Sequence, residues 1–272
     1  MNPIGVFDSG YGGLTILKAL RHLLPQYDYV YLGDNARAPY GTRSFQVVTE
    51  FTRQAVDCLF GLGCPLVILA CNTASAKALR SIQQKMLPFT ADPSRRVLGV
   101  IRPTVEALPA VSTTGHVGVL ATPGTVASHS YQMEVAKLAP EMSVTEVAAP
   151  MWVPLVENRE SHEAGADYFV KKYLDMLISA DPLIDTIVLG CTHYPILIDK
   201  IRKYAPASCR ILSQGELVAR SLADYMRRHP EMHSRIGRTG SCRFFSTENP
   251  DKFDSLAGLF LGQEVESAHI EL

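Results

Sequence analysis

The 272-residue chain lacks features that mark several large classes of protein. No apolar run approaches the roughly 18–20 residues of a membrane-spanning helix. The net charge is −1 at pH 7, which gives no overall attraction to DNA, RNA or anionic membranes. The first residues, MNPIGVFDSG, contain no basic segment followed by a long apolar one, so we predict no signal peptide. We therefore expect a cytoplasmic protein with neither nucleic acid nor a membrane as partner.

The six cysteines lack the spacing of common metal or redox sites. The chain has no C-x-x-C motif and no Cys/His cluster with zinc-finger spacing. In a cytoplasm we expect the thiols to be reduced. We interpret four of them as ordinary core or surface residues: Cys58, Cys64, Cys209 and Cys242.

The other two cysteines follow two similar apolar runs. Residues 64–76 read CPLVILACNTASA, and residues 184–195 read IDTIVLGCTHYP. Each run is typical of a buried parallel strand, and it leads through a small residue to Cys71 or Cys191 and then to polar residues. Ligand sites of open α/β sheets lie at the carboxyl ends of strands. The pair therefore indicates chemistry that needs one thiol on each side of a substrate.

A second likeness suggests that the chain contains an internal repeat. IGVFDSGYGGLT (Ile4–Thr15) resembles VGVLATPGTVAS (Val117–Ser128). The spacing between these segments and that between the two cysteines differ by a few residues, which an inserted loop could absorb. We interpret the pattern as a diverged repeat of about half the chain, although any α/β protein reuses strand–loop–helix units. Two halves facing each other would bring both cysteines to one cleft.

Apolar runs that predict strands alternate with helical patterns almost to the end of the chain. The clearest predicted strands are Ile4–Phe7, Tyr29–Leu32, Leu66–Ala70, Val97–Ile101, Val117–Ala121, Val144–Val147, Thr186–Leu189 and Arg243–Phe245. The predicted helices include Ser44–Leu62, Thr73–Met86 and Val126–Leu138. This alternation predicts parallel sheets covered by helices. We predict an α/β fold of two pseudo-symmetric, mostly parallel α/β domains, 1–98 plus 206–272 and 99–205, with the active site in the cleft between them.

A glycine-rich turn follows the first predicted strand in FDSGYGGL. Its glycines allow a tight turn and expose N–H groups at a helix start, where a carboxylate or phosphate could bind. The segment lacks the G-x-x-x-x-G-K-[ST] form of a phosphate-binding loop, and a plain tight turn is the alternative. If the strands are neighbours, Asp8 lies beside the end of the Cys71 strand and Ser9 follows it.

Polar residues beside the two cysteines offer hydrogen bonds at the predicted strand ends. Asn72 and Thr73 follow the first cysteine, and Thr192 and His193 follow the second. Helix capping is an alternative role for them, and it is compatible with substrate binding. Taken alone, DNARAPYG, with Tyr40 and Gly41, is only a polar turn, and Glu157 in MWVPLVENRE is a solvated loop acid.

Six segments, in this order and spacing, resemble the glutamate racemases: FDSGYGGLT, DNARAPYG, ACNTASA, GVLATPGT, VPLVE and GCTHYP. The resemblance covers nearly all of residues 3–265. The wider group of amino-acid racemases shares the paired cysteine strands, and His193 favours glutamate because aspartate racemases usually have glutamate there. Asn35 stands where a hydroxyl residue is usual, and Ala149 precedes Pro150 where cysteine is common. Neither departure removes a proposed catalytic group.

The resemblance implies that the Cα of free glutamate is inverted without pyridoxal phosphate or any other cofactor, and without a metal. Cys71 and Cys191 would be the base and the acid, exchanging roles with direction. An ordinary thiol has a pKa near 8.5, and a helix N-terminus after each cysteine is expected to lower it. Asp8 beside Cys71, and His193 and Glu157 beside Cys191, would assist proton movement.

The resemblance also implies the substrate contacts and the partner. Besides Asp8 and His193, the implied amino-acid contacts are Ser9, Tyr40, Gly41, Asn72, Thr73 and Thr192. Their place in the repeat adds Thr122 and Thr125 as contacts to the side-chain carboxylate. The partner is glutamate, with D-glutamate supplied to peptidoglycan; a homodimer is left open. The alternatives are a racemase of another acidic amino acid, such as aspartate, and a non-catalytic amino-acid binding protein, which needs no pair of thiols.

Overall fold

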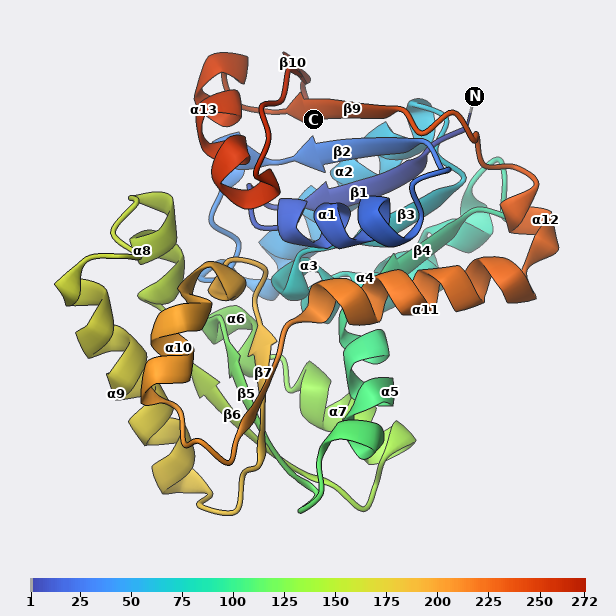
Figure 1. Cartoon of the computed structure of the whole chain (residues 1–272). Coiled ribbons are helices and arrows are strands. Elements are labelled where there is room, and N and C mark those ends of the chain that lie inside the picture. The colour runs from blue at the N-terminus through green and yellow to red at the C-terminus, as the bar shows by residue number, and fades with distance from the viewer. Residues whose placement is uncertain (1) are drawn as a thin grey trace.

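The strands form two separate parallel sheets that helices cover (Figure 1). The computed structural model describes residues 2–272. Within that range one sheet has the strand order β10-β9-β2-β1-β3-β4, the other has the order β6-β5-β7-β8, and all paired strands run parallel. The predicted α/β class, with mostly parallel sheets, is confirmed.

The first sheet has three fully buried strands, β1, β2 and β3. Its strands are β1 (Ile4–Asp8), β2 (Tyr29–Gly33), β3 (Leu66–Leu69), β4 (Arg96–Gly99), β9 (Cys242–Ser246) and β10 (Ser267–His269). Val6 belongs to the core that includes α1 (Leu14–Leu23), whereas its neighbour Phe7 belongs to the core that includes α2 (Phe45–Gly61). Because helices cover both faces, the central strands read as continuous apolar runs.

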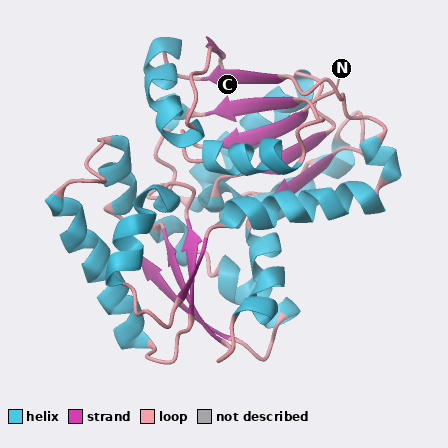
Figure 2. Cartoon of the chain, viewed as in Figure 1, coloured by secondary structure: helices cyan, strands magenta, loops and turns pink. Residues whose placement is uncertain are grey.

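The second sheet is covered in the same way. Its strands are β5 (His116–Ala121), β6 (Ser143–Ala148), β7 (Thr186–Gly190) and β8 (Arg210–Leu212). Leu189 of β7 packs in the core with α9 (Ala164–Ala180), and Val188 packs with α5 (Ile101–Val111) and α7 (Ser130–Leu138). The two sheets therefore repeat one layered arrangement, which Figure 2 shows as strands between helices.

The other helices are shorter or lie at the junction of the halves. They are α3 (Asn72–Lys77), α4 (Leu79–Lys85), α6 (Pro123–Val126), α8 (Trp152–Glu157), α10 (Ile198–Tyr204), α11 (Gln214–Arg228), α12 (Pro230–His233), α13 (Pro250–Leu261), and the 3₁₀ turns η1 (Asn35–Arg37), η2 (Leu87–Phe89) and η3 (Tyr194–Leu197). The helix predicted over Thr73–Met86 is divided at Ala78. The one predicted over Val126–Leu138 is interrupted at His129, whose φ is 53°. Among residues 2–272, no helix is both long and apolar enough to cross a membrane.

The chain leaves the first sheet after β4 and returns to it after β8. β9 pairs with β2, and α11 packs against α1, so the C-terminal part adds to the first half (Figure 1). The domain bounds at 98 and 205 stay a prediction. Because β8 pairs with β7, we propose that the second unit continues to Leu212.

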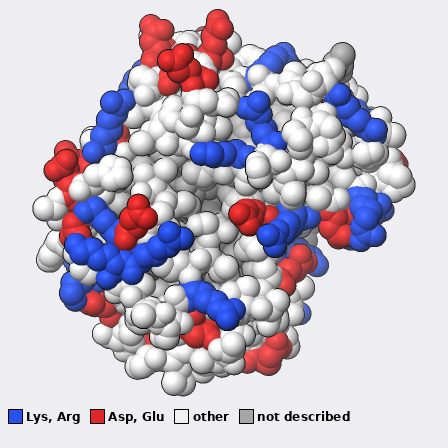
Figure 3. Space-filling view, in the orientation of Figure 1, with Lys and Arg blue, Asp and Glu red and all other residues white. Residues whose placement is uncertain are grey.

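Charged side chains of both signs are mixed on the face that Figure 3 shows. Many form surface pairs, such as Lys203 with Asp167 at 3.0 Å and Arg102 with Glu106 at 2.9 Å. Exposed pairs of this kind contribute little to stability, roughly 0–1 kcal/mol each. The mixture agrees with the net charge of −1.

Candidate active site

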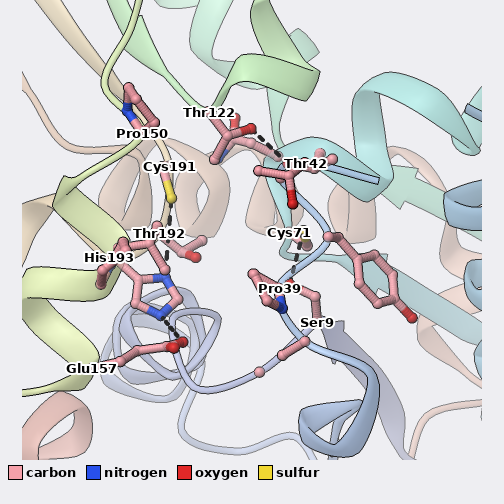
Figure 4. Close-up of a pocket in the computed structure, with 18 of the residues that line it drawn as sticks. Ser9, Pro39, Thr42, Cys71, Thr122, Pro150, Glu157, Cys191, Thr192 and His193 are labelled. Carbon is pink, nitrogen blue, oxygen red and sulfur yellow. Dashed lines mark hydrogen bonds and ion pairs between the residues drawn. The ribbon is translucent and has the colours of Figure 1, made fainter. Parts of the chain in front are cut away.

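A cavity of about 280 Å³ lies where the carboxyl ends of the two sheets meet (Figure 4). Residues that come directly after β1, β3, β5 and β7 line it, so both halves contribute loops. Its volume is close to the lower end of the range for small-molecule sites, about 300–1,000 Å³. The structure places every predicted site residue in its lining except Asp8 and Thr125, which lie immediately behind it.

The two cysteines approach this cavity from different sheets. Cys71 follows β3 and is the N-cap of α3, and Cys191 follows β7. Each is 6% exposed, and Figure 4 shows them on opposite sides of the cavity. Because each strand ends at the cavity, the fold itself determines which face of a bound molecule each thiol meets.

Cys71 has a carboxyl group and a hydroxyl group as neighbours. Ser9 Oγ lies 3.5 Å from its Sγ, which also accepts a hydrogen bond from Ala74 N at 3.4 Å. Burial and the nearby charge of Asp8 raise the pKa of the Cys71 thiol to about 12, despite these two hydrogen bonds. The N–H of Ala74 at the helix start does lower the pKa of Cys71, as expected, but burial and the charge of Asp8 outweigh it.

Asp8 lies between the two halves of the site. Its Oδ1 accepts from Gly10 N at 2.9 Å, and Thr192 Oγ1 donates to its Oδ2 at 3.4 Å. Burial raises the pKa of Asp8, and the positive charge of His193 opposes that shift. This carboxyl group therefore contacts the loop after β7 as well as its own.

The glycine-rich turn allows the two halves to pack closely. A Cβ on Gly12 would lie 2.2 Å from Thr192 Oγ1 and 2.5 Å from His193 Nδ1. Thr15 Oγ1 also donates to the Thr192 carbonyl at 3.1 Å. The glycine is thus required because the first-sheet turn touches the loop that carries the second thiol.

Cys191 has a histidine–carboxylate pair beside it. His193 Nδ1 lies 4.0 Å from Cys191 Sγ, and His193 Nε2 lies 3.0 Å from Glu157 Oε1 (Figure 4). Burial disfavours the imidazolium, but hydrogen bonds with Cys191 and Glu157 outweigh burial and raise the pKa of His193 to about 10. Glu157, at the end of α8, is therefore a partner of His193 and not a solvated loop acid.

Threonine hydroxyls from both halves meet at the opposite end of the cavity. Thr73 Oγ1 lies 2.9 Å from Thr122 Oγ1 and 3.3 Å from Thr125 Oγ1. Gly124 N donates to Gly41 O at 2.7 Å, which joins the loop before α2 to α6. The cluster presents neutral donors to whatever occupies this end.

Two predicted contacts use their side chains elsewhere. The Tyr40 hydroxyl donates to buried Asp34, so only other parts of Tyr40 face the cavity. The Asn72 side chain donates to Gln214 Oε1 at 2.6 Å and accepts from the Tyr131 hydroxyl at 2.8 Å. Gln214 Nε2 in turn donates to Tyr131 and to Thr104 Oγ1.

This buried network joins α3, α5, α7 and α11, and sequence reasoning missed it. Its members lie far apart in the chain and carry no motif, so no local signal could have found them. Residues 2–272 contain no group of three or more His, Cys, Asp or Glu side chains that could hold a metal ion. The prediction that activity needs no cofactor stays a prediction.

Comparison with known proteins finds relatives that are all named as racemases. Residues 14–221 match the family described as Asp/Glu/Hydantoin racemase. The chain is 41% identical to the glutamate racemase of Ruegeria sp. (strain TM1040), over 96% of this chain and 97% of that one. The crystal structure of glutamate racemase isoform RacE1 from Bacillus anthracis matches with a TM-score of 0.90 and 33% identity, covering 100% of this chain and 98% of that one. The glutamate racemase of Francisella tularensis subsp. tularensis SCHU S4, solved in complex with D-glutamate, matches with a TM-score of 0.86 and 32% identity, covering 99% and 97%.

Proposed function

The chain belongs to the Asp/Glu/hydantoin racemase family, and we propose that it interconverts L-glutamate and D-glutamate. Relatives named glutamate racemase match nearly its whole length, and one related structure holds D-glutamate. The observation that carries the proposal is the pair of buried thiols, Cys71 and Cys191, on opposite sides of one cavity of small-molecule size.

Two thiols can invert a carbon centre without turning the substrate over. One thiolate takes the Cα proton, so the C–H bond breaks and an S–H bond forms. The other thiol gives its proton to the opposite face, so its S–H bond breaks and a new C–H bond forms. The proton balance closes, and exchange with solvent restores the starting thiolate and thiol. Cys71 and Cys191 exchange these roles when the reaction reverses.

The neighbours of each thiol provide different assistance. His193 Nδ1 lies 4.0 Å from Cys191 Sγ, and Glu157 holds the imidazole in that orientation through Nε2. Among residues 2–272, no cationic side chain contributes to the shift of Cys71, whose pKa is raised to about 12, so the substrate ammonium is the charge that favours a thiolate there. Ser9 faces that ammonium beside Cys71, and the carboxyl group of Asp8 attracts its charge from behind the cavity lining.

The remaining donors suit the substrate carboxylates. We assign the side-chain carboxylate to the end with Thr122, Thr73 and the Gly41 backbone, and Thr125 supports these hydroxyls from behind. Thr192 and the start of α3 at Asn72 remain for the amino-acid end. D-Glutamate for peptidoglycan, a cytoplasmic location, a homodimer and independence from cofactors belong to the same proposal.

A direct assay tests the proposal. Purified protein, dialysed exhaustively against chelator, is incubated with L-glutamate, D-glutamate, L-aspartate or glutamine, and the enantiomers are separated by chiral chromatography. We expect both glutamate enantiomers to reach a 1:1 mixture, with aspartate and glutamine far slower. Faster turnover of aspartate would overturn the substrate assignment. Absence of turnover without added pyridoxal phosphate or metal would overturn the mechanism.

A further inference from the structure

A buried lysine lies behind one end of the cavity. Lys77 is the last residue of α3, the helix that Cys71 caps, and it is 8% exposed. Its Nζ donates to the carbonyl oxygen of Arg43 at 2.7 Å. Burial lowers the pKa of Lys77, and no acidic side chain among residues 2–272 opposes that shift or forms an ion pair with it. A buried charge without a counter-charge costs stability, so the presence of a lysine at this position calls for an explanation.

The cavity itself has little positive charge at this end. Of the described residues that line it, none is a lysine or an arginine. The charged pair His193 and Glu157 lies on the Cys191 side. The proposed substrate carries two carboxylates and one ammonium, so a net negative charge must be held largely by neutral donors. An uncompensated cation nearby would balance that charge.

Lys77 lies beside Gly124 and beside the segment 41–43, whose first two residues line the cavity. A Cβ on Gly124 would lie 2.8 Å from Lys77 Nζ and 2.8 Å from the Gly41 carbonyl oxygen. Gly41 and Thr42 line the cavity, and Arg43, the acceptor for Lys77, comes next in the chain. Figure 4 shows Thr42 and Thr122 near each other at this end. Because Gly124 has no side chain, the ammonium fits against it, and Gly124 N is hydrogen-bonded to Gly41 of the cavity wall.

We propose that Lys77 is a specificity-determining residue, whose ammonium favours a carboxylate side chain at the Gly41–Thr122 end of the cavity. The inference rests on the proposed function and deepens it. Lys77 does not touch the substrate. It acts through the positive electrostatic potential that its ammonium adds at this end of the cavity. The distal carboxylate keeps its charge while the proton moves at Cα. The lysine therefore stabilises the bound substrate and the transition state equally. Removing its charge should raise KM and leave kcat unchanged.

The alternative is that Lys77 only holds the loop with Arg43 in place. Lys77→Gln separates the two roles, because the amide keeps a hydrogen-bond donor and loses the charge. We expect Lys77→Gln to raise KM for both glutamate enantiomers at least about tenfold, because the Coulomb attraction of a unit positive charge behind the carboxylate is lost. We expect kcat to stay within about twofold, and the inhibition constant of glutamine, which has a neutral side chain, to stay unchanged.

Lys85→Gln is the matched control, because it removes the same charge from an exposed position on α4. Thermal unfolding of each variant checks that it is folded. The inference is wrong if Lys77→Gln leaves the glutamate KM at the wild-type value. A displaced loop would lower kcat as well as affinity for glutamate, or would weaken glutamine and glutamate binding equally. Either result in Lys77→Gln would also show that the inference is wrong. Failure of the wild-type protein to racemise glutamate would instead overturn the proposed function.

Discussion

The two thiols occupy matching places in the fold but have unlike neighbours. Cys71 and Cys191 each follow a buried parallel strand and a small residue. Cys71 faces Ser9 and the buried carboxyl group of Asp8, whereas Cys191 faces the imidazole of His193, whose pKa is raised by hydrogen bonds with Cys191 and Glu157. The matching strands therefore place the two thiols in similar positions, while the different side chains around them make their proton chemistry different.

This asymmetry has a limit that follows from the reaction. Two enantiomers have equal free energy in water, so the equilibrium constant is one and kcat/KM must be the same in both directions. Any difference between the Cys71 and Cys191 sides can appear only in kcat and KM separately, or in half-reactions. The kcat and KM of variants on either side must therefore be measured with both L-glutamate and D-glutamate.

Loss of either thiol should have the largest effect. We expect Cys71→Ala and Cys191→Ala each to lower racemisation by at least about 10³-fold, since general acid–base groups contribute roughly 10²–10⁴-fold. Each variant should still eliminate slowly from a β-substituted analogue of one enantiomer, and the two should prefer opposite enantiomers. Cys209→Ala, at a partly buried cysteine outside the cavity, is the control and should keep wild-type activity.

Removal of the cation beside Cys191 should have the next largest effect. Gln can keep a hydrogen bond to Glu157 without a charge, so His193→Gln isolates the imidazolium. We expect kcat to fall about 10²-fold, and kcat/KM to fall equally for L- and D-glutamate. A variant with wild-type kcat in both directions would show that His193 takes no part in proton movement.

The raised pKa of His193 also predicts a dependence of stability on pH. Its pKa in the folded protein is about 10, against an ordinary 6.5. The stability gained from the bound proton is therefore fully present below about pH 6.5 and is lost as pH rises toward about 10. Thermal unfolding of wild type and His193→Gln between these values should show their difference in Tm shrinking with rising pH. A difference that grows would contradict the charged imidazole.

The smallest effect on chemistry should come from the network that supports the Cys71 side. Gln214→Leu leaves the buried Asn72 amide N–H without its partner and removes one of the partners of Tyr131 and of Thr104. We expect unfolding free energy to fall by about 2–4 kcal/mol, with kcat lowered only a few-fold. Urea unfolding measures the change in free energy, and steady-state kinetics measures the change in kcat. A change under about 0.5 kcal/mol would mean that water replaces the amide fully.

Parts of this picture could be predicted from the chain because they are local. The strand that leads into each cysteine is a continuous apolar run, and the glycine turn with Asp8 follows β1 directly. The pairing of Asn72 with Gln214 depends on tertiary packing across 142 residues, and the Tyr40 hydroxyl turns from the cavity because Asp34 is buried beside it. Short strands such as β8, with three residues, give too weak a pattern to find.

The central claim is that each thiol serves one face of the substrate. The measurement that tests it most directly is turnover of a single glutamate enantiomer in D₂O, stopped early and analysed for deuterium at Cα in each enantiomer. Two thiols on opposite faces predict deuterium in nearly all of the newly formed enantiomer and almost none in the remaining substrate. Equal deuterium in both enantiomers at early times would show that one base serves both faces, and would contradict the account.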